Sequence, residues 1–369
     1  MENNTFQMEV VAKPAASKDL KALGKSELEA FAVSLGEPAY RGRQLFKWLY
    51  GKGAHSFDEM TDLPLPLRKR LSEVARLDTI EKAAQQTARD GTTKALFKLA
   101  SGRHVESVLI PDFEDEEDDT PGRLTVCVSS QVGCAMGCTF CATGQMGFKQ
   151  NLTAGEIFDQ VWQMNQLAVE RYGKRISNVV FMGMGEPLLN YDNVLRSISI
   201  LTDKDGFGMS SRRITVSTVG LARRIRQLAD EGVKFRLAVS LHAPTDDKRS
   251  SIMPVNRAAA TDLTALKDAI QHFTSTTGNP ITYEYCMFAG FNDSPEDARN
   301  LAKVVAWAPS KVNLIMYNPV EGLGFQRTPE DRLNRFIRIL VEKGITVTVR
   351  RSKGQEIDAA CGQLAVKEA

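Results

Sequence analysis

From residue 124 onward, short apolar stretches alternate with longer stretches in which apolar residues recur every three or four positions. The short stretches resemble buried strands and the longer ones resemble amphipathic helices. Strand–helix pairs in series predict a parallel sheet with helices outside it. The predicted strands cover residues 124–130, 178–183, 213–219, 235–241, 280–288, 312–317 and 345–351. The predicted helices cover residues 153–171, 192–203, 222–231, 262–276, 295–307 and 329–343.

The part of the chain before residue 124 has a different pattern. Residues 20–77 predict three short helices, which end near Gly36, near Gly51 and near residue 74. This compact module resembles a helix-hairpin-helix-like accessory domain. Residues 80–110 then alternate like two strands around a Ser-Gly turn.

Basic and aromatic side chains are mixed within the helical module. This mixture is typical of an RNA-docking surface, and it is equally typical of a solvated helix face over an aromatic core. The sequence leaves both interpretations open. The residues concerned are Arg41, Arg43, Lys47, Lys52, Arg68, Lys69, Arg70, Tyr40, Phe46, Trp48 and Tyr50.

Composition adds limits but no function. The chain has 369 residues, of which 43% are hydrophobic and 25% charged, and its formal net charge is +2. It has no apolar run long enough for a membrane span and no signal-peptide pattern at its start. We therefore expect a cytoplasmic protein, in which six cysteines indicate metal ligands or catalysts before structural disulfides.

The most informative motif places Cys134, Cys138 and Cys141 at C-x3-C-x2-C spacing. Thiolates suit iron–sulfur clusters and zinc, but a structural zinc normally takes four protein ligands. Three ligands would leave one iron of a [4Fe–4S] cluster open to another molecule. Buried or zinc-bound cysteines are the alternative. With Phe140 before the last cysteine, the loop resembles the signature of radical S-adenosylmethionine (SAM) enzymes, in which the open iron binds SAM.

The position of this loop decides between a flat sheet and a barrel. The loop directly follows the first strand, where a barrel keeps its active site. The predicted fold is therefore α/β, a partial (β/α)6 radical SAM barrel with a small N-terminal helical domain. We expect a disordered leader at 1–17, a helical accessory or RNA-docking domain at 18–80, and a β-hairpin linker with an acidic loop (112–119) at 81–122. The barrel is expected at 123–357 and a C-terminal segment at 358–369.

Small clusters of polar residues follow successive strands of the predicted barrel. Any one of them could be a loop cap, but four at the same rim favour a shared ligand. Glycines before Glu186 resemble the Gly-Gly-Glu-Pro element of radical SAM enzymes, in which the glutamate holds the SAM amino group. The residues expected to bind SAM are Gly185, Glu186, Ser217, Ser240, Leu241, His242 and Asn318.

Three stretches together resemble the RlmN-type adenine-C2 RNA methyltransferases. They are residues 126–134, 182–187 and 358–364, and the likeness runs from about residue 20 to Leu364. It implies that Cys361 accepts a methyl group from one SAM, which a radical from a second SAM then activates for addition to C2. It further implies that Glu106 removes the C2 proton and that Cys127 attacks the sulfur of Cys361, leaving a disulfide. Cys286, inside an apolar strand, is predicted to be core.

The resemblance also implies the substrates and partners. They are 23S rRNA near the peptidyl-transferase centre, the tRNA adenosine 3′ of the anticodon, and a reducing donor such as a flavodoxin, with the enzyme acting as a monomer. The related Cfr-type C8 methyltransferase uses the same cysteines and remains a rival. An RNA-binding protein with a structural metal and no catalysis is a second rival, from another class.

Overall fold

The computed structural model describes residues 17–114, 120–255, 261–350 and 352–365. Nearly all of the expected leader and most of the acidic run 112–119 lie outside these residues. The chain divides into two compact units, Met1–Asp78 and Thr79–Ala369.

The first unit is helical, as its sequence pattern predicts. Gly42 allows its first two long helices to approach closely, since a Cβ there would lie 2.3 Å from the Cα of Glu29. The Tyr50 hydroxyl donates a hydrogen bond to the Lys21 carbonyl across the unit, at 2.8 Å. Its elements are β1 (Lys18–Asp19), η1 (Leu20–Ala22), α1 (Lys25–Ser34), α2 (Tyr40–Phe46), η2 (Lys47–Gly51), η3 (Phe57–Glu59), α3 (Leu65–Val74) and β2 (Ala75–Arg76).

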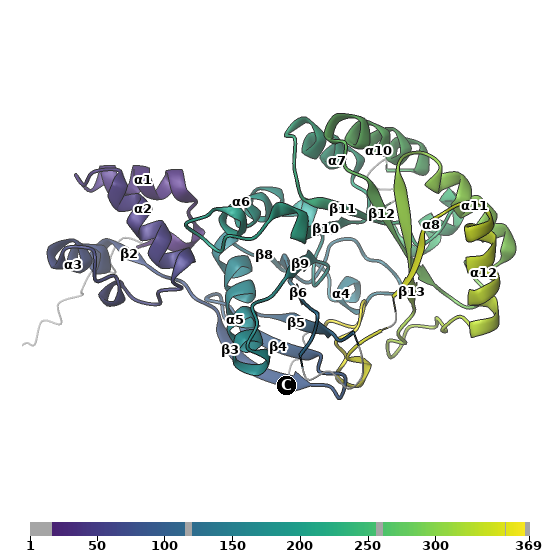
Figure 1. The fold of residues 1–369 in the computed structure, drawn as a ribbon, viewed down its shortest axis with the longest axis horizontal. Coiled ribbons are helices and arrows are strands. Elements are labelled where there is room, and N and C mark those ends of the chain that lie inside the picture. The colour runs from purple at the N-terminus through teal and green to yellow at the C-terminus, as the bar shows by residue number, and fades with distance from the viewer. Residues whose placement is uncertain (1–16, 115–119, 256–260, 351, 366–369) are drawn as a thin grey trace, which may run out of the picture. The chain divides into compact units, whose positions relative to one another are not determined.

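A ten-stranded sheet forms the centre of the second unit (Figure 1). Its order is β14-β13-β12-β11-β10-β9-β6-β5-β4-β3, and neighbours from β6 to β14 are parallel. The predicted α/β fold with a parallel sheet is thus confirmed. The strands are β3 (Glu81–Thr87), β4 (Thr93–Lys98), β5 (His104–Asp112), β6 (Arg123–Cys127), β9 (Asn178–Phe181), β10 (Ile214–Thr218), β11 (Arg236–Ser240), β12 (Ile281–Met287), β13 (Ser310–Met316) and β14 (Val347–Arg350).

Amphipathic helices connect the parallel strands and cover the outside of the curved sheet (Figure 1). The α5 helix begins at a capping box, in which Thr153 and Glu156 satisfy each other's backbone N–H groups, and ends at Gly173 in a left-handed conformation. The helices are α5 (Ala154–Tyr172), α6 (Tyr191–Thr202), α7 (Ala222–Asp230), α10 (Leu263–Thr277), α11 (Pro295–Val305) and α12 (Glu330–Glu342).

Short elements occupy the loops of the second unit. One of them, α8, follows β11 and carries Arg249, whose side chain is fully buried. They are β7 (Gln131–Val132), α4 (Ala142–Gln145), β8 (Gln150–Asn151), η4 (Pro187–Leu189), η5 (Ser211–Arg213), α8 (Asp246–Ile252) and η6 (Gln355–Ile357).

The segment 81–122, expected to form a hairpin linker, supplies three strands of the central sheet. β5 pairs antiparallel with β6, β4 with β5, and β3 with β4. The sequence did not indicate β3, because all seven of its residues are exposed and so lack an apolar alternation. Through this pairing, β5 brings its residues beside the strand that carries Cys127.

Among the described residues, no helix is both long and apolar enough to cross a membrane.

Candidate active site

The cysteine loop follows β6 and bends back at glycines. Gly133 and Gly137 have φ of +70° and +61°, and a Cβ on Gly133 would meet the Gly147 carbonyl oxygen. This path points the three thiols into one cavity of about 150 Å³. The ring of Phe140 packs behind the loop against His242, with ring centroids 5.0 Å apart.

Two of the three loop cysteines, Cys134 and Cys138, are buried, and Cys141 is half-buried. Burial raises the pKa of Cys134 to about 12, and it raises the pKa of Cys138 and of Cys141 as well. Neighbouring thiolates raise the pKa of Cys138 further, because like charges repel. A bound metal would favour the thiolate form of these sulfurs, because cysteine ligates metals when it is deprotonated.

Cys127 and Cys361 line the same cavity as the loop thiols. Cys127 lies in β6 and is 6% exposed, whereas Cys361 is exposed. All six cysteines of the chain lie in the described residues and are free thiols. The structure therefore does not support the disulfide that the family resemblance implies. Cys286, predicted to be core, is buried in β12.

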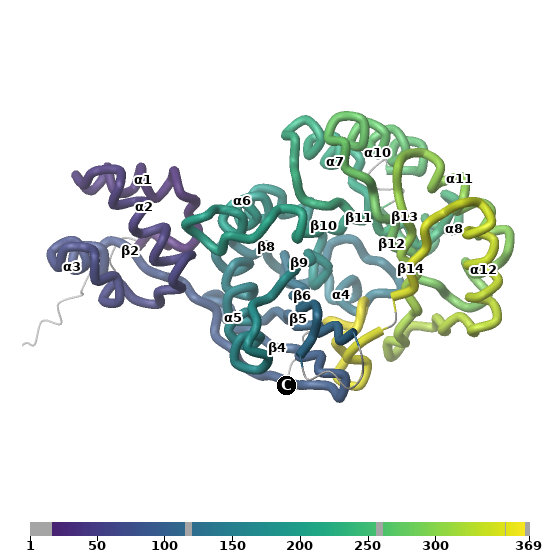
Figure 2. The backbone as a smooth tube through the Cα atoms, viewed as in Figure 1, coloured from purple at the N-terminus to yellow at the C-terminus, as the bar shows by residue number. Residues whose placement is uncertain are grey.

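The C-terminal segment reaches this cavity by bonding to the cysteine loop. The Ala142 N–H donates to the Gly362 carbonyl at 2.9 Å, and the Thr143 hydroxyl donates to the Leu364 carbonyl at 2.5 Å. Figure 2 shows the yellow end of the chain running beside α4. Residues more than 200 positions apart are thus joined, and Cys361 directly precedes the first of these two contacts in the C-terminal segment.

Polar residues expected to bind SAM gather in an adjoining cavity of about 120 Å³. Its lining includes Gly185, Glu186, Ser217, Ser240 and His242. Gly185 has φ +100°, and a Cβ there would lie 2.5 Å from Gln131. The hydroxyls of Ser217 and Ser240 are 3.4 Å apart. These five residues come from three strand ends, as the sequence predicts.

Two groups in this cavity have strongly shifted pKa values. Burial raises the pKa of Glu186 to about 7, although its carboxylate accepts hydrogen bonds from the N–H groups of Leu188 and Val219 at 3.0 and 2.8 Å. Burial lowers the pKa of His242 to about 3, and its Nδ1 accepts the Cys286 N–H at 3.0 Å. His242 is therefore a neutral ring whose free Nε2–H can donate.

Two other residues expected to bind SAM, Leu241 and Asn318, are not among the residues that line this cavity. Leu241 is fully buried, and its N–H donates to the Glu284 carbonyl at 3.0 Å. The side-chain amide nitrogen of Asn318 donates a hydrogen bond to the Cys361 carbonyl at 3.4 Å. Its side-chain oxygen accepts a hydrogen bond from the Gln355 side-chain amide at 3.0 Å. Both polar ends of Asn318 are thus bonded to residues 355–361, which lead into and begin the C-terminal segment.

Glu106 lies in a separate cavity of about 260 Å³, which the C-terminal segment borders through Asp358 and Ala365. Its carboxylate pairs with Lys94 at 3.0 Å. Burial nevertheless raises the pKa of Glu106, and Lys94 only partly opposes this effect. The structure does not bring Glu106 into the cavity that holds the five cysteines.

Arg350, at the end of β14, was not indicated by the sequence, yet it lines both the cysteine cavity and the polar cavity. Burial lowers the pKa of its guanidinium, but Cys361, Glu284 and Cys127 raise that pKa by more. One carboxylate oxygen of Glu284 accepts a hydrogen bond from the Asn313 side-chain amide at 2.9 Å. The other oxygen has no hydrogen-bond partner among the described residues. No local pattern marks Arg350, because its neighbours come from distant strands.

Comparison with known proteins identifies the family. Residues 18–77 match the ribosomal RNA large subunit methyltransferase N-terminal domain, and residues 128–302 match the radical SAM superfamily. The chain is 61% identical over 347 residues to the probable dual-specificity RNA methyltransferase RlmN of Salinibacter ruber, covering 94% of each chain. The chain belongs to the RlmN family.

Further relatives agree with RlmN membership. The dual-specificity RNA methyltransferase RlmN of Geobacter sulfurreducens is 48% identical over 346 residues, covering 94% of this chain and 91% of its own. A radical SAM methyltransferase from Sphaerobacter thermophilus is 43% identical, with a TM-score of 0.87 over 95% of this chain and 100% of its own. The fold and the enzyme class predicted from the sequence are therefore confirmed.

Radical SAM membership implies that RlmN proteins use a [4Fe–4S] cluster and SAM. The donor set of this chain fits the cluster, since three thiols face one cavity. No three His, Cys, Asp or Glu side chains in the described residues are placed to hold a single metal ion. A cluster spreads its thiolates over separate irons, so it does not need such close ligands.

Proposed function

We propose that this chain methylates C2 of an adenosine in 23S rRNA and in tRNA, with Cys361 as the methyl carrier. One observation carries the proposal. Cys127 and Cys361 line the same cavity as Cys134, Cys138 and Cys141. A structural zinc takes four protein ligands, so it would use at most one of these two thiols in addition to the three loop cysteines. This arrangement favours an enzyme over an RNA-binding protein with a structural metal.

The proposed roles follow from where each residue lies. The three loop thiols hold the cluster, which with SAM supplies one-electron chemistry. Gly185, Glu186, Ser217, Ser240 and His242 would bind SAM beside it. Glu186 suits an ammonium group, because a nearby cation would offset the burial that raises its pKa.

The remaining assignments rest on the family likeness. Leu241, through its main chain, and Asn318 would complete the SAM site. Glu106 would take the C2 proton, and Cys127 would release the product by attacking the Cys361 sulfur. A flavodoxin-like electron donor, a cytoplasmic location and a monomeric state belong to the same proposal.

Nucleoside analysis tests the proposal directly. 23S rRNA and tRNA from cells with and without this protein would be digested and compared by mass spectrometry. We expect 2-methyladenosine in both RNAs only when the protein is present. A gain of 8-methyladenosine instead would identify the C8 chemistry of the Cfr-type enzymes, and no methylated adenosine would contradict catalysis on RNA.

A further inference from the structure

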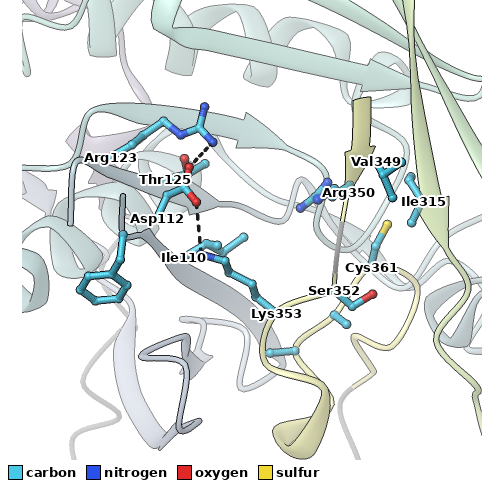
Figure 3. Close-up of a pocket in the computed structure, with 13 residues that line it drawn as sticks. Ile110, Asp112, Arg123, Thr125, Ile315, Val349, Arg350, Ser352, Lys353 and Cys361 are labelled. Atoms are coloured by element: carbon cyan, nitrogen blue, oxygen red, sulfur yellow. Dashed lines mark hydrogen bonds and ion pairs between the residues drawn. The ribbon is translucent and has the colours of Figure 1, made fainter. Parts of the chain in front are cut away.

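A fourth cavity, of about 490 Å³, also opens onto Cys361 (Figure 3). It shares Ile110, Arg350, Ala359, Ala360 and Cys361 with the cavity of the loop thiols. Its volume lies within the range of about 300–1,000 Å³ that is usual for small-molecule sites. It can therefore admit a group the size of one nucleotide to the thiol proposed to carry the methyl.

The charged side chains that line this cavity are mostly basic. They include three cations, Arg123, Arg350 and Lys353, and one anion, Asp112. The Asp112 carboxylate bridges two of the cations: Oδ2 lies 2.6 Å from Arg123 Nη2, and Oδ1 lies 3.3 Å from Lys353 Nζ. Lys353 Nζ also donates to the Pro111 carbonyl at 2.6 Å, which fixes its position.

These two ion pairs are accessible to water. The side chains of Arg123, Asp112 and Lys353 are 59%, 45% and 32% exposed. Exposed pairs of this kind contribute little to stability, so another anion can replace the carboxylate. A phosphodiester has two unesterified oxygens, as a carboxylate has, and pairs with arginine in the same way.

The two ends of the cavity differ in chemistry. Figure 3 shows Arg123 and Asp112 at one end, and Cys361 with Arg350 at the other. The apolar side chain of Ile110 lines the space between them, and Phe113 also belongs to the lining. A nucleotide fits this arrangement with its charged phosphate at the Arg123 end and its flat base beside Ile315, Val349 and Cys361.

Asp112 and Arg123 are also partners in the register of β5 and β6. A cross-strand ion pair alone would be explained as support for these two strands. Lys353, however, comes from the C-terminal part of the chain and reaches the same carboxylate. Two cationic side chains from separate parts of the chain thus contact the same carboxylate, and together they form a position that an anion can occupy.

We propose that Arg123 and Lys353 bind a backbone phosphate of the RNA, next to the adenosine whose base reaches Cys361, and that Asp112 fills the phosphate position in the free protein. This inference rests on the proposed function and locates its substrate. Asp112 holds the two cations ready and is displaced when RNA arrives.

RNA binding by single variants of the full chain tests this site. The probe is a fluorescent tRNA anticodon stem-loop, with its dissociation constant measured by anisotropy at several salt concentrations. We expect Arg123→Gln and Lys353→Gln each to weaken binding about fivefold. Each should also reduce the slope of log affinity against log salt by about 0.7, the value for one phosphate contact of single-stranded nucleic acid.

Asp112→Asn gives the opposite expectation. Without its internal anion the cavity should bind the stem-loop about two- to fivefold more tightly, because the competing charge is gone. The matched control is Lys267→Gln, which removes an exposed lysine of α10. Iron content and melting temperature check that each variant is folded and loaded.

Two results would overturn the inference. One is that Arg123→Gln and Lys353→Gln bind RNA as Lys267→Gln does. The other is that Asp112→Asn weakens binding as the cation variants do, which would make the carboxylate a structural support. Either result, with 2-methyladenosine still produced by the parent chain, would refute this site alone. A parent chain that methylates no RNA would refute the proposed function itself.

Discussion

Cys127 and Cys361 differ in access although they share one cavity. Cys361 is exposed, so both a methyl donor and an RNA base can reach its sulfur. Cys127 is 6% exposed in β6, and burial raises its pKa to about 12. A buried thiol can attack only a neighbour, so this difference supports Cys361 as the methyl carrier and Cys127 as the group that releases the product.

The two thiols should therefore fail differently when replaced by alanine. Cys127→Ala should still load a methyl group and add it to RNA, but it should then remain attached, because no thiolate is left to break the bond to the product. Cys361→Ala should never attach. Denaturing electrophoresis with and without ribonuclease would show RNA on the first variant only. Cys286→Ala, which alters a buried thiol outside this cavity, should carry no RNA. Attached RNA on both active-site variants, or on neither, would contradict these roles.

Arg350 is the cation placed to make these thiols reactive. Although Cys361 is an exposed residue, desolvation of its sulfur raises its pKa, and Arg350 opposes the rise for both Cys361 and Cys127. Because the thiolate is the nucleophile, a lower pKa gives a faster reaction near neutral pH. This role could not be predicted from the sequence, since the fold alone brings Arg350 to residues 127 and 361.

Removing this charge should shift the pH dependence of methyl transfer to Cys361. In Arg350→Met the thiol pKa should rise further, so the rising part of the rate profile should lie roughly one pH unit higher than in the parent chain. Arg350→Lys, the matched control, keeps the charge and should stay near the parent profile. The rate of methyl incorporation, measured by protein mass spectrometry from pH 6 to 10, gives both profiles. Identical profiles for Met and Lys would show that the charge of Arg350 does not act on Cys361.

At the scale of elements, the sequence predicted the strands and helices that bury apolar side chains. The parallel strands and the outer helices lie within a few residues of their predicted bounds. β3 was missed because a wholly exposed strand has no apolar alternation. The contacts of the C-terminal segment could not be predicted, because each joins residues distant in sequence, such as Thr143 and Leu364.

Asn318 could either anchor the C-terminal segment or contact SAM, and a substitution can tell these two roles apart. Its side chain bonds to Cys361 and Gln355, so Asn318→Ala should release the segment that carries Cys361. We expect faster amide hydrogen exchange in residues 355–364, roughly tenfold if about 1.4 kcal/mol of local stability is lost. Asn279→Ala, which removes a hydrogen bond to Val233 far along the chain, is the control. Unchanged exchange together with weaker SAM binding would instead make Asn318 a SAM ligand.

At the scale of the whole molecule, the net charge of +2 gives no strong attraction to RNA, so binding must depend on local groups. The cations predicted for RNA docking in the first unit are partly engaged. Arg43 pairs with Glu29 at 3.1 Å, and Lys52 lies over the Trp48 ring. Lys47 and Lys69 are exposed and have no ion pair among the described residues. These lysines are the strongest candidates for phosphate contacts in that unit.

Removing the first compact unit tests whether cluster and SAM binding belong to the second unit and RNA binding to the first. A chain of residues 79–369 contains every residue assigned above to the cluster and to SAM, so we expect it to bind iron and to form 5′-deoxyadenosine. Its affinity for tRNA should fall about tenfold or more, because phosphate contacts of the first unit are lost. The matched variant is the full chain with Lys47, Lys52 and Lys69 each changed to Gln, which keeps the unit and removes its charge. If both proteins lose tRNA affinity to the same extent, these lysines make the RNA contacts of the first unit. If only the truncated chain loses affinity, other groups of the first unit make those contacts. If the 79–369 chain keeps full tRNA affinity, the first unit does not take part in RNA binding, and its basic residues form a solvated surface.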